Sequence, residues 1–128
     1  MKYYTNKVLD GNFDEVIEKV TNALKEEGFG VLTEVDVTST FKKKLDIDFR
    51  NYRILGACNP PNAHAALTAD PHIGLMLPCN VVVQETEEGK IDVAAIDPKA
   101  SMAAVENKDV EKVAERIKGQ LETVINKI

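Results

Sequence analysis

The sequence predicts an α+β domain with two layers, in which an antiparallel sheet of about five strands carries two long helices on one face. Two observations predict this class. Short stretches rich in β-branched residues recur along the chain and indicate strands. Two longer stretches, one near each end, repeat apolar residues at helical spacing. Together they give the order β-α-β-β-β-β-α, with short helical insertions.

The first half of the chain predicts two strands around a long helix. Residues 3–9 form the first strand, and Asn12 then provides a helix N-cap with Glu15 three residues later. The apolar stripe of the helix consists of Phe13, Val16, Ile17, Val20 and Leu24. Gly28 ends this helix, and residues 29–37 alternate with period two, as a strand does. Residues 38–40 are a cluster of capping residues before a single helical turn at 41–45.

The second half predicts three strands and the last helix. Residues 52–57 form a short strand, and Asn59 with two prolines opens a short helix. Residues 75–85 form a longer strand with Pro78 in its first half, followed by a turn at 87–90 and a partner strand at 91–96. Asn107 opens the final amphipathic helix. Gly119 lies inside this helix, and we expect close packing against the sheet to explain it.

Length and charge exclude several classes of protein. A chain of 128 residues predicts a single domain over 1–128. The net charge of −5 argues against general nucleic-acid binding, which needs a basic surface. No apolar run reaches the roughly 18 residues of a membrane span, so no membrane partner is expected. Two cysteines without a visible secretion signal predict a cytoplasmic protein with reduced thiols.

Residues 54–83 hold both cysteines, both histidines and four of the five prolines. We predict that any ligand-binding site lies here, and its candidate residues are Cys58, Asn59, His64, Cys79 and Asn80. Cys58 precedes a helix N-terminus, which offers partial positive charge and free N–H groups to a thiolate. Cys79 shares its strand phase with apolar residues, so its default position is the core. Cys58 has the same alternative, as a small buried hydrophobe.

The basic residues Lys42, Lys43, Arg50 and Arg53 form a weaker candidate, a patch able to receive an anion or an acidic partner. The commoner explanation of such a cluster is a solvated charged face. The sequence contains no P-loop, zincin motif or nucleophile elbow, and it identifies no cofactor.

One long motif resembles a known family. The run from Asp48 to Pro61 (DFRNYRILGACNPP), the pairs Ala63-His64 and Ala66-Leu67, and the segment LPCNV at 77–81 resemble the family called domain of unknown function 302, DUF302. The resemblance implies a β-α-β(4)-α fold similar to the TATA-binding protein, and commonly a homodimer. It implies no established activity, and a similar fold does not transfer DNA binding. Ala65 departs from the larger, often basic residue expected there.

Three functions are therefore open. The first is a module that binds a small ligand, a sulfur species or a soft metal ion around the two Cys-Asn pairs. The second is a structural or adaptor homodimer in which the motif shapes the fold. The third is a thiol-dependent enzyme that uses Cys58 with His64 as its partner.

Overall fold

The computed structural model describes residues 2–128. Its strands in this range are β1 (Tyr4–Leu9), β2 (Gly30–Asp36), β3 (Tyr52–Cys58), β4 (Cys79–Glu85) and β5 (Ile91–Ile96). Its helices are α1 (Phe13–Glu26), α2 (Val37–Leu45), α3 (Pro60–Ala69), α4 (Pro98–Ser101) and α5 (Lys108–Lys127), with a short 3-10 helix, η1 (Ile73–Met76).

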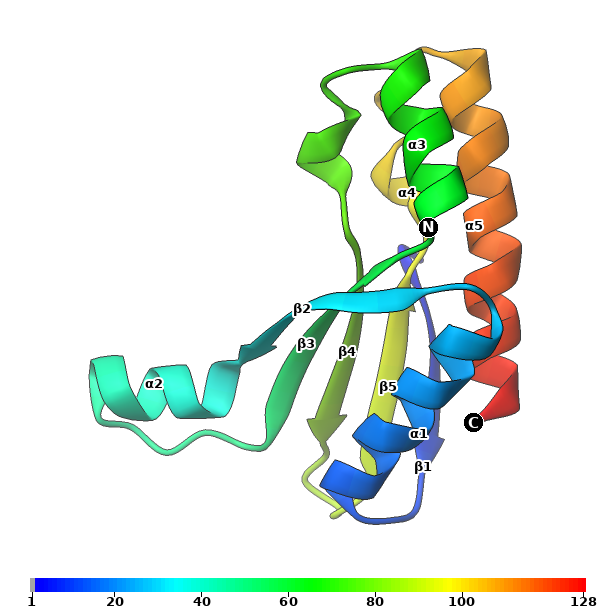
Figure 1. The fold of residues 1–128 in the computed structure, drawn as a ribbon. Helices are drawn as coiled ribbons and strands as arrows, with labels where there is room; N and C mark the ends of the chain where they lie inside the picture. Colours follow the sequence, from blue (N-terminus) through cyan, green and yellow to red (C-terminus); the bar gives the residue numbers. More distant parts are fainter. Residues whose placement is uncertain (1) are drawn as a thin grey trace.

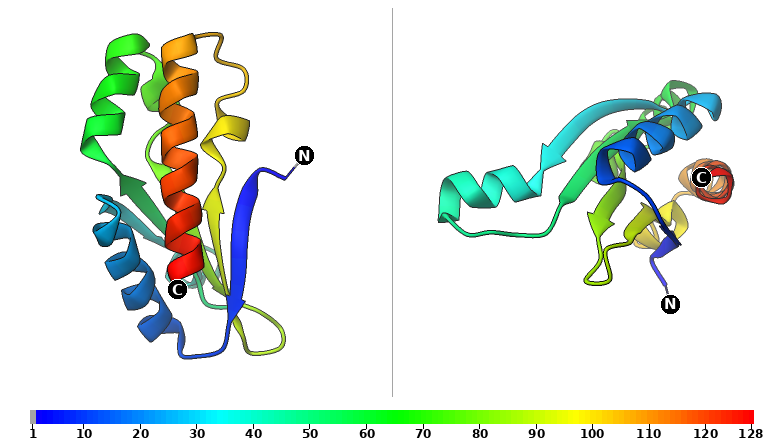
Figure 2. Two further views of the ribbon diagram at one scale, coloured as in Figure 1. Left: turned by 90° about the vertical axis from the view of Figure 1, so that its right-hand side faces the viewer. Right: turned by 90° about the horizontal axis from the view of Figure 1, so that it is seen from below.

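The strands form one antiparallel sheet in the order β1-β5-β4-β3-β2. Both long helices, α1 and α5, pack on the same face of this sheet, while α2 projects away from it (Figures 1 and 2). The predicted α+β class, with its five-stranded antiparallel sheet and long C-terminal helix, is confirmed.

Strand alternation divides the sheet into two different faces. On β4 and β5, Val81, Val83 and Val93 point toward the helices and are fully buried. They pack against the apolar stripes of α1 and α5, which bury Val20, Leu24, Ile117, Leu121 and Val124. Each such side chain stabilises the fold by about 1.5–3 kcal/mol through removal from water. We call this side of the sheet the covered face.

Local capping follows the sequence closely in three helices. The side chain of Asn12 accepts a hydrogen bond from the Glu15 N–H, at 3.2 Å, and begins α1. Asn59 caps α3 through the Asn62 N–H, also at 3.2 Å, with prolines in the first turn. Asn107 caps α5 in the same way. These caps place Cys58 directly before the N-terminus of α3, as predicted.

The structure corrects the predicted single turn at 41–45. Helix α2 has nine residues and begins at Val37, because Asp36 and not the cluster at 38–40 provides the N-cap. The Asp36 side chain accepts from the Ser39 N–H at 2.9 Å. Three more capping residues follow Asp36, but they lie inside the helix, where the Thr40 hydroxyl bonds the Asp36 carbonyl.

Two further expectations were wrong. The strand predicted over 75–85 begins only at Cys79, because residues 73–76 form η1 and the Leu77–Pro78 peptide is cis. Close packing does not explain Gly119. This residue is exposed, and a Cβ placed on it would meet no atom within 4 Å outside its own helix backbone and chain neighbours.

Candidate functional site

The two cysteines are neighbours but point to opposite sides of the sheet. Cys79 pairs with Ala57 across β3 and β4, and both side chains lie on the covered face. Cys58 is the next residue of β3, so strand alternation turns it toward the other face, where it is half-buried. It pairs with Gly30, whose missing side chain leaves open space beside it.

Burial controls the chemistry of Cys79. Loss of hydration raises the pKa of its thiol to about 11, and the nearby Cys58 thiolate adds to this rise. Cys79 therefore stays protonated at neutral pH and behaves as a small core residue. A soft-metal site with both sulfurs would require deprotonation of this buried thiol.

The other three candidate ligand-binding residues lie apart from each other. Asn59 caps α3 with its side-chain oxygen, and its Nδ2 donates to the Glu27 carbonyl at 3.4 Å. His64 is exposed on α3, and within residues 2–128 its side chain makes no hydrogen bond to either cysteine. Asn80 is exposed opposite Gly56, on the same side of the sheet as Cys58. The predicted set is thus spread over both faces of the sheet and a helix.

Residues 2–128 contain neither a cluster of metal-ligating side chains nor a helix able to cross a membrane. Between Lys2 and Ile128, no three His, Cys, Asp or Glu side chains gather in a group that could hold a metal ion. Over the same range, the helices are too short or too polar to cross a membrane.

The predicted anion patch is divided between the two sides of the sheet. Lys42, Lys43 and Arg53 line a cleft of about 430 Å³ between α2 and the start of α1. Arg53 pairs there with Glu34 at 3.0 Å and Asp36 at 3.4 Å.

Two of the three basic side chains of this cleft, Lys42 and Arg53, already form ion pairs with nearby carboxylates. Lys42 pairs with Asp46 at 3.5 Å and Asp48 at 3.4 Å. Arg50 lies on the opposite side of the sheet, where it bonds Gln84 and stacks over Phe49. Anion binding at this cleft stays a prediction.

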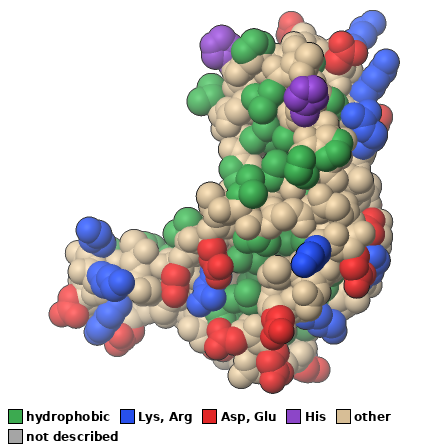
Figure 3. Space-filling model, in the orientation of Figure 1, with side chains coloured by type: hydrophobic (Ala, Val, Ile, Leu, Met, Phe, Trp, Pro, Cys, Tyr) green, Lys and Arg blue, Asp and Glu red, His purple; other side chains and the backbone are tan. Residues whose placement is uncertain are grey.

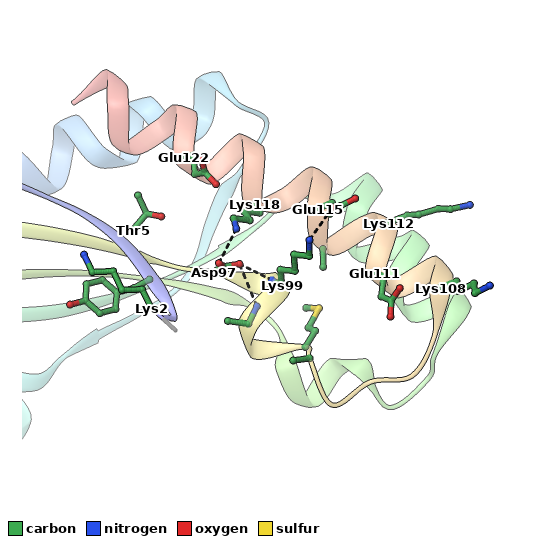
Figure 4. Close-up of a pocket in the computed structure, with 15 residues that line it drawn as sticks. Lys2, Thr5, Asp97, Lys99, Lys108, Glu111, Lys112, Glu115, Lys118 and Glu122 are labelled. Carbon is green, nitrogen blue, oxygen red and sulfur yellow. Dashed lines mark hydrogen bonds and ion pairs between the residues drawn. The ribbon is translucent and has the colours of Figure 1, made fainter.

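A second hollow, which the sequence did not predict, runs between the start of β1, α4 and α5 and holds about 960 Å³ (Figure 4). Its walls carry both signs of charge. Lys118 pairs with Asp97 at 3.2 Å and Lys99 pairs with Glu115 at 3.2 Å. Because acidic and basic side chains alternate along it, this groove shows no preference for a ligand of one charge.

The second face of the sheet is turned away from α1 and α5 (Figures 1 and 2). We call it the open face. Its residues are Tyr4, Asn6, Val8, Gly30, Thr33, Val35, Tyr52, Ile54, Gly56, Cys58, Asn80, Val82, Gln84, Asp92, Ala94 and Ile96. Its middle row is mainly apolar: Val35, Ile54, Val82 and Ala94 lie side by side across four strands.

A hydrogen-bonded polar row crosses the open face below its apolar centre. Asp92 accepts from Asn6 at 2.8 Å and from Gln84 at 3.4 Å. Gln84 in turn accepts from the Nε of Arg50 at 2.9 Å. The row joins three strands, and its polar atoms are largely satisfied by one another. These mutual hydrogen bonds hold the side chains of the row in place although they face solvent.

At one end of the open face stands the arm, formed by α2 and the segment that follows it, residues 37–49 (Figure 1). Helix α2 buries no residue. Isolated helices shorter than about 12–15 residues are marginal in water, and packing of an apolar face normally supplies their stability. Here Leu45 is 60% exposed and Ile47 is 46% exposed.

An aromatic cluster attaches the arm to the open face. Phe41 of α2 meets Phe49 edge-on, with ring centroids 5.1 Å apart, and Phe49 meets Tyr52 at 6.1 Å. The Arg50 guanidinium lies 4.4 Å from the centre of the Phe49 ring. Aromatic and arginine side chains of this kind supply most of the binding energy in protein interfaces.

The opposite end of the open face carries a second apolar patch around η1. Leu75 is 85% exposed, and Met76 and Leu67 are also exposed. The space-filling view shows hydrophobic side chains in the upper part of the molecule, near the two histidines (Figure 3). The arm stands at the other end of the strands, on the same side of the molecule (Figures 1 and 3).

The class of protein defined by this architecture is a two-layer α+β domain with one bare sheet face. The domain of unknown function DUF302 matches residues 4–128, and the chain belongs to this family. Its structure is similar to the crystal structure of an uncharacterized conserved DUF302 protein from Bacillus stearothermophilus, with a TM-score of 0.91 and 27% sequence identity. The match covers 98% of each chain. No curated protein matches the sequence.

Proposed function

We propose that the protein is a structural or adaptor module that works as a homodimer joined through the open face of its sheet. The observation that carries this proposal is the partly exposed apolar row of Val35, Ile54, Val82 and Ala94, beside an arm whose nine-residue helix α2 buries nothing. Exposed apolar surface of this extent, with a polar row beside it, is typical of an interaction site.

A second copy of the chain is the occupant that these features fit best. The open face has an apolar centre and few net charges, because Asp92 and Arg50 are joined through Gln84 in one neutral row. Such a face can pack on its own copy without opposing like charges.

The experiment is a mass measurement in solution by light scattering or sedimentation. We expect a particle of twice 14.1 kDa for the natural chain and a monomer for Val82→Asp, which places a charge at the centre of the open face. Asn22→Asp on the exposed side of α1 introduces the same charge and should remain a dimer. A monomeric natural chain at every concentration measured would contradict the proposal.

A second candidate function rests on Cys58. This half-buried thiol lies on the open face beside the space left by Gly30, whereas Cys79 is in the core. An accessible thiol next to unfilled space supports the binding of a sulfur species or another small ligand there, with Asn80 on the same face. His64 and Asn59 would not take part, because one is exposed on α3 and the other caps that helix.

Native mass spectrometry of protein purified without chelator or reductant tests this candidate. A bound mass that disappears in Cys58→Ser and persists in Cys79→Ser would support it. A natural chain that carries no added mass, with two free thiols, would leave the homodimer as the better account.

A further inference from the structure

We infer that the two copies meet head to tail, so that the arm of each copy packs on the η1 patch of the other. This inference rests on the proposed homodimer. It specifies which parts of the open side touch: Leu45 of one copy against Leu67, Leu75 and Met76 of its partner.

The size of the sheet face is the first argument. Five strands of about six residues, with strands about 4.8 Å apart and about 3.3 Å per residue, cover roughly 500 Å². A stable protein interface needs about 800 Å² on each partner. The side chains that stand out from this plane add accessible surface to it, and contact at the ends of the strands would enlarge the interface further.

The exposed side chains supply the second argument. Besides Val8 and Val35 on the open face itself, exposed large apolar residues lie at its two ends, with Leu45 on the arm and Leu67, Leu75 and Met76 around η1. At 85% exposure, Leu75 has almost no contact in its own chain. The two patches differ in shape: the arm projects from the sheet as a helix, whereas η1 lies beside the sheet (Figure 1).

A two-fold symmetry axis allows this contact. Two identical sheets packed face to face are related by a two-fold axis that lies between them. If this axis runs across the strands, it reverses the direction of each strand but keeps the strand order, so β3 lies over β3. The arm, at one end of β3, then meets η1, at the other end of the β3–β4 pair. If the axis ran along the strands, the arm would instead lie over the β1 edge.

The test uses two variants separately and then mixed. Leu45→Lys and Leu75→Asp each introduce a charge at an exposed position, so both variants should fold normally. Each alone should raise the dimer dissociation constant at least about a hundredfold, because an unpaired charge is buried twice per dimer.

Mixed in equal amounts, the two variants should form a one-to-one heterodimer. In it, the introduced lysine faces the introduced aspartate at one contact, and Leu45 faces Leu75 at the other. Native mass spectrometry separates this species from both parents. Arm-on-arm packing predicts no such rescue, because the introduced lysine would then face an unchanged arm.

Each result has a distinct meaning. A monomeric natural chain would contradict the proposed homodimer itself. A natural dimer whose Leu45→Lys and Leu75→Asp variants remain dimers, or fail to rescue each other, would overturn only the head-to-tail contact. Lys44→Asp, at an exposed charged position on the same helix, is the control and should leave the dimer intact.

Discussion

The two faces of one sheet have similar side chains but different surroundings. On β4, Val81 and Val83 are fully buried by the helices, while Val82 between them is only partly covered. On the edge strand β2, Val35 of the open face is 46% exposed. A sheet with one wet face normally alternates apolar and polar residues. The three consecutive valines of β4 instead make both faces of the sheet apolar at the centre.

This difference shows which face of the sheet finds its apolar contacts within the chain and which face does not. The covered face has all its apolar partners within the chain, so it accounts for folding. The open face keeps its polar row satisfied and leaves its apolar row partly exposed, which is the surface that the proposed homodimer would bury. Folding and assembly are therefore separable by substitution, one residue at a time along a strand.

The largest expected effect comes from moving one charge by a single residue along β4. Val83→Asp buries a carboxylate on the covered face without a partner and should cost more than about 4 kcal/mol, enough to unfold most domains of this size. Val82→Asp should fold and only dissociate. Circular dichroism with urea unfolding measures both. Equal loss of stability in the two variants would break the comparison between the faces.

The next effect is the pH dependence of the free energy of unfolding that Cys79 of the covered face contributes. The pKa of Cys79 rises from 9.0 to about 11 in the folded protein. Between these values the unfolded chain loses this proton while the folded chain keeps it. Stability is therefore fully present below pH 9 and falls as the pH rises toward 11, by about 2–3 kcal/mol in total.

Urea unfolding at pH 8.5 and 10.5, on the natural chain and on Cys79→Ala, isolates this contribution. Lysines and tyrosines titrate in both proteins and cancel in the comparison. The natural chain should lose more stability than Cys79→Ala over this range. Identical losses would mean that Cys79 is hydrated in the folded protein.

The fold was largely predictable because its signals are local. Helices α1 and α5 each have a long apolar stripe, and in each helix an asparagine N-cap directly precedes the stripe. Helix α2 was predicted too short because four capping residues, Asp36 and those at 38–40, lie within five positions, and only tertiary context selects the first. The start of β4 was misplaced because Leu75 and Leu77 continue the strand alternation by chance, through a 3-10 helix and a cis proline.

The open face was harder to predict than the fold because its residues are spread over five strands. Sequence reasoning favoured rare residues in one segment, and the structure brings Cys58 and Cys79 together at one end of the sheet. The open face requires knowledge of strand order and register before Val35, Ile54 and Val82 become neighbours. The available signal was the unbroken apolar run of β4, which favours burial on both faces.

The smallest expected effect compares two glycines, Gly56 and Gly30, at the Cys58 end of β3 and β2. A Cβ on Gly56 would lie 2.0 Å from Thr33 Oγ1 and 2.8 Å from Pro78 Cγ, whereas a Cβ on Gly30 would meet nothing within 4 Å. Gly56→Ala should therefore cost roughly 1–2 kcal/mol, because the Thr33 hydroxyl can rotate but the proline ring cannot move freely.

Gly30→Ala should change stability by less than about 0.5 kcal/mol, or raise it slightly by restricting the unfolded chain. Both are best measured in the Val82→Asp background, where assembly does not contribute. If Gly56→Ala is as harmless as Gly30→Ala, then β2 and β3 are not held as closely as the Thr33 contact requires. If Gly30→Ala is costly in the natural dimer but harmless in the monomeric background, the space beside Cys58 is filled by the second copy.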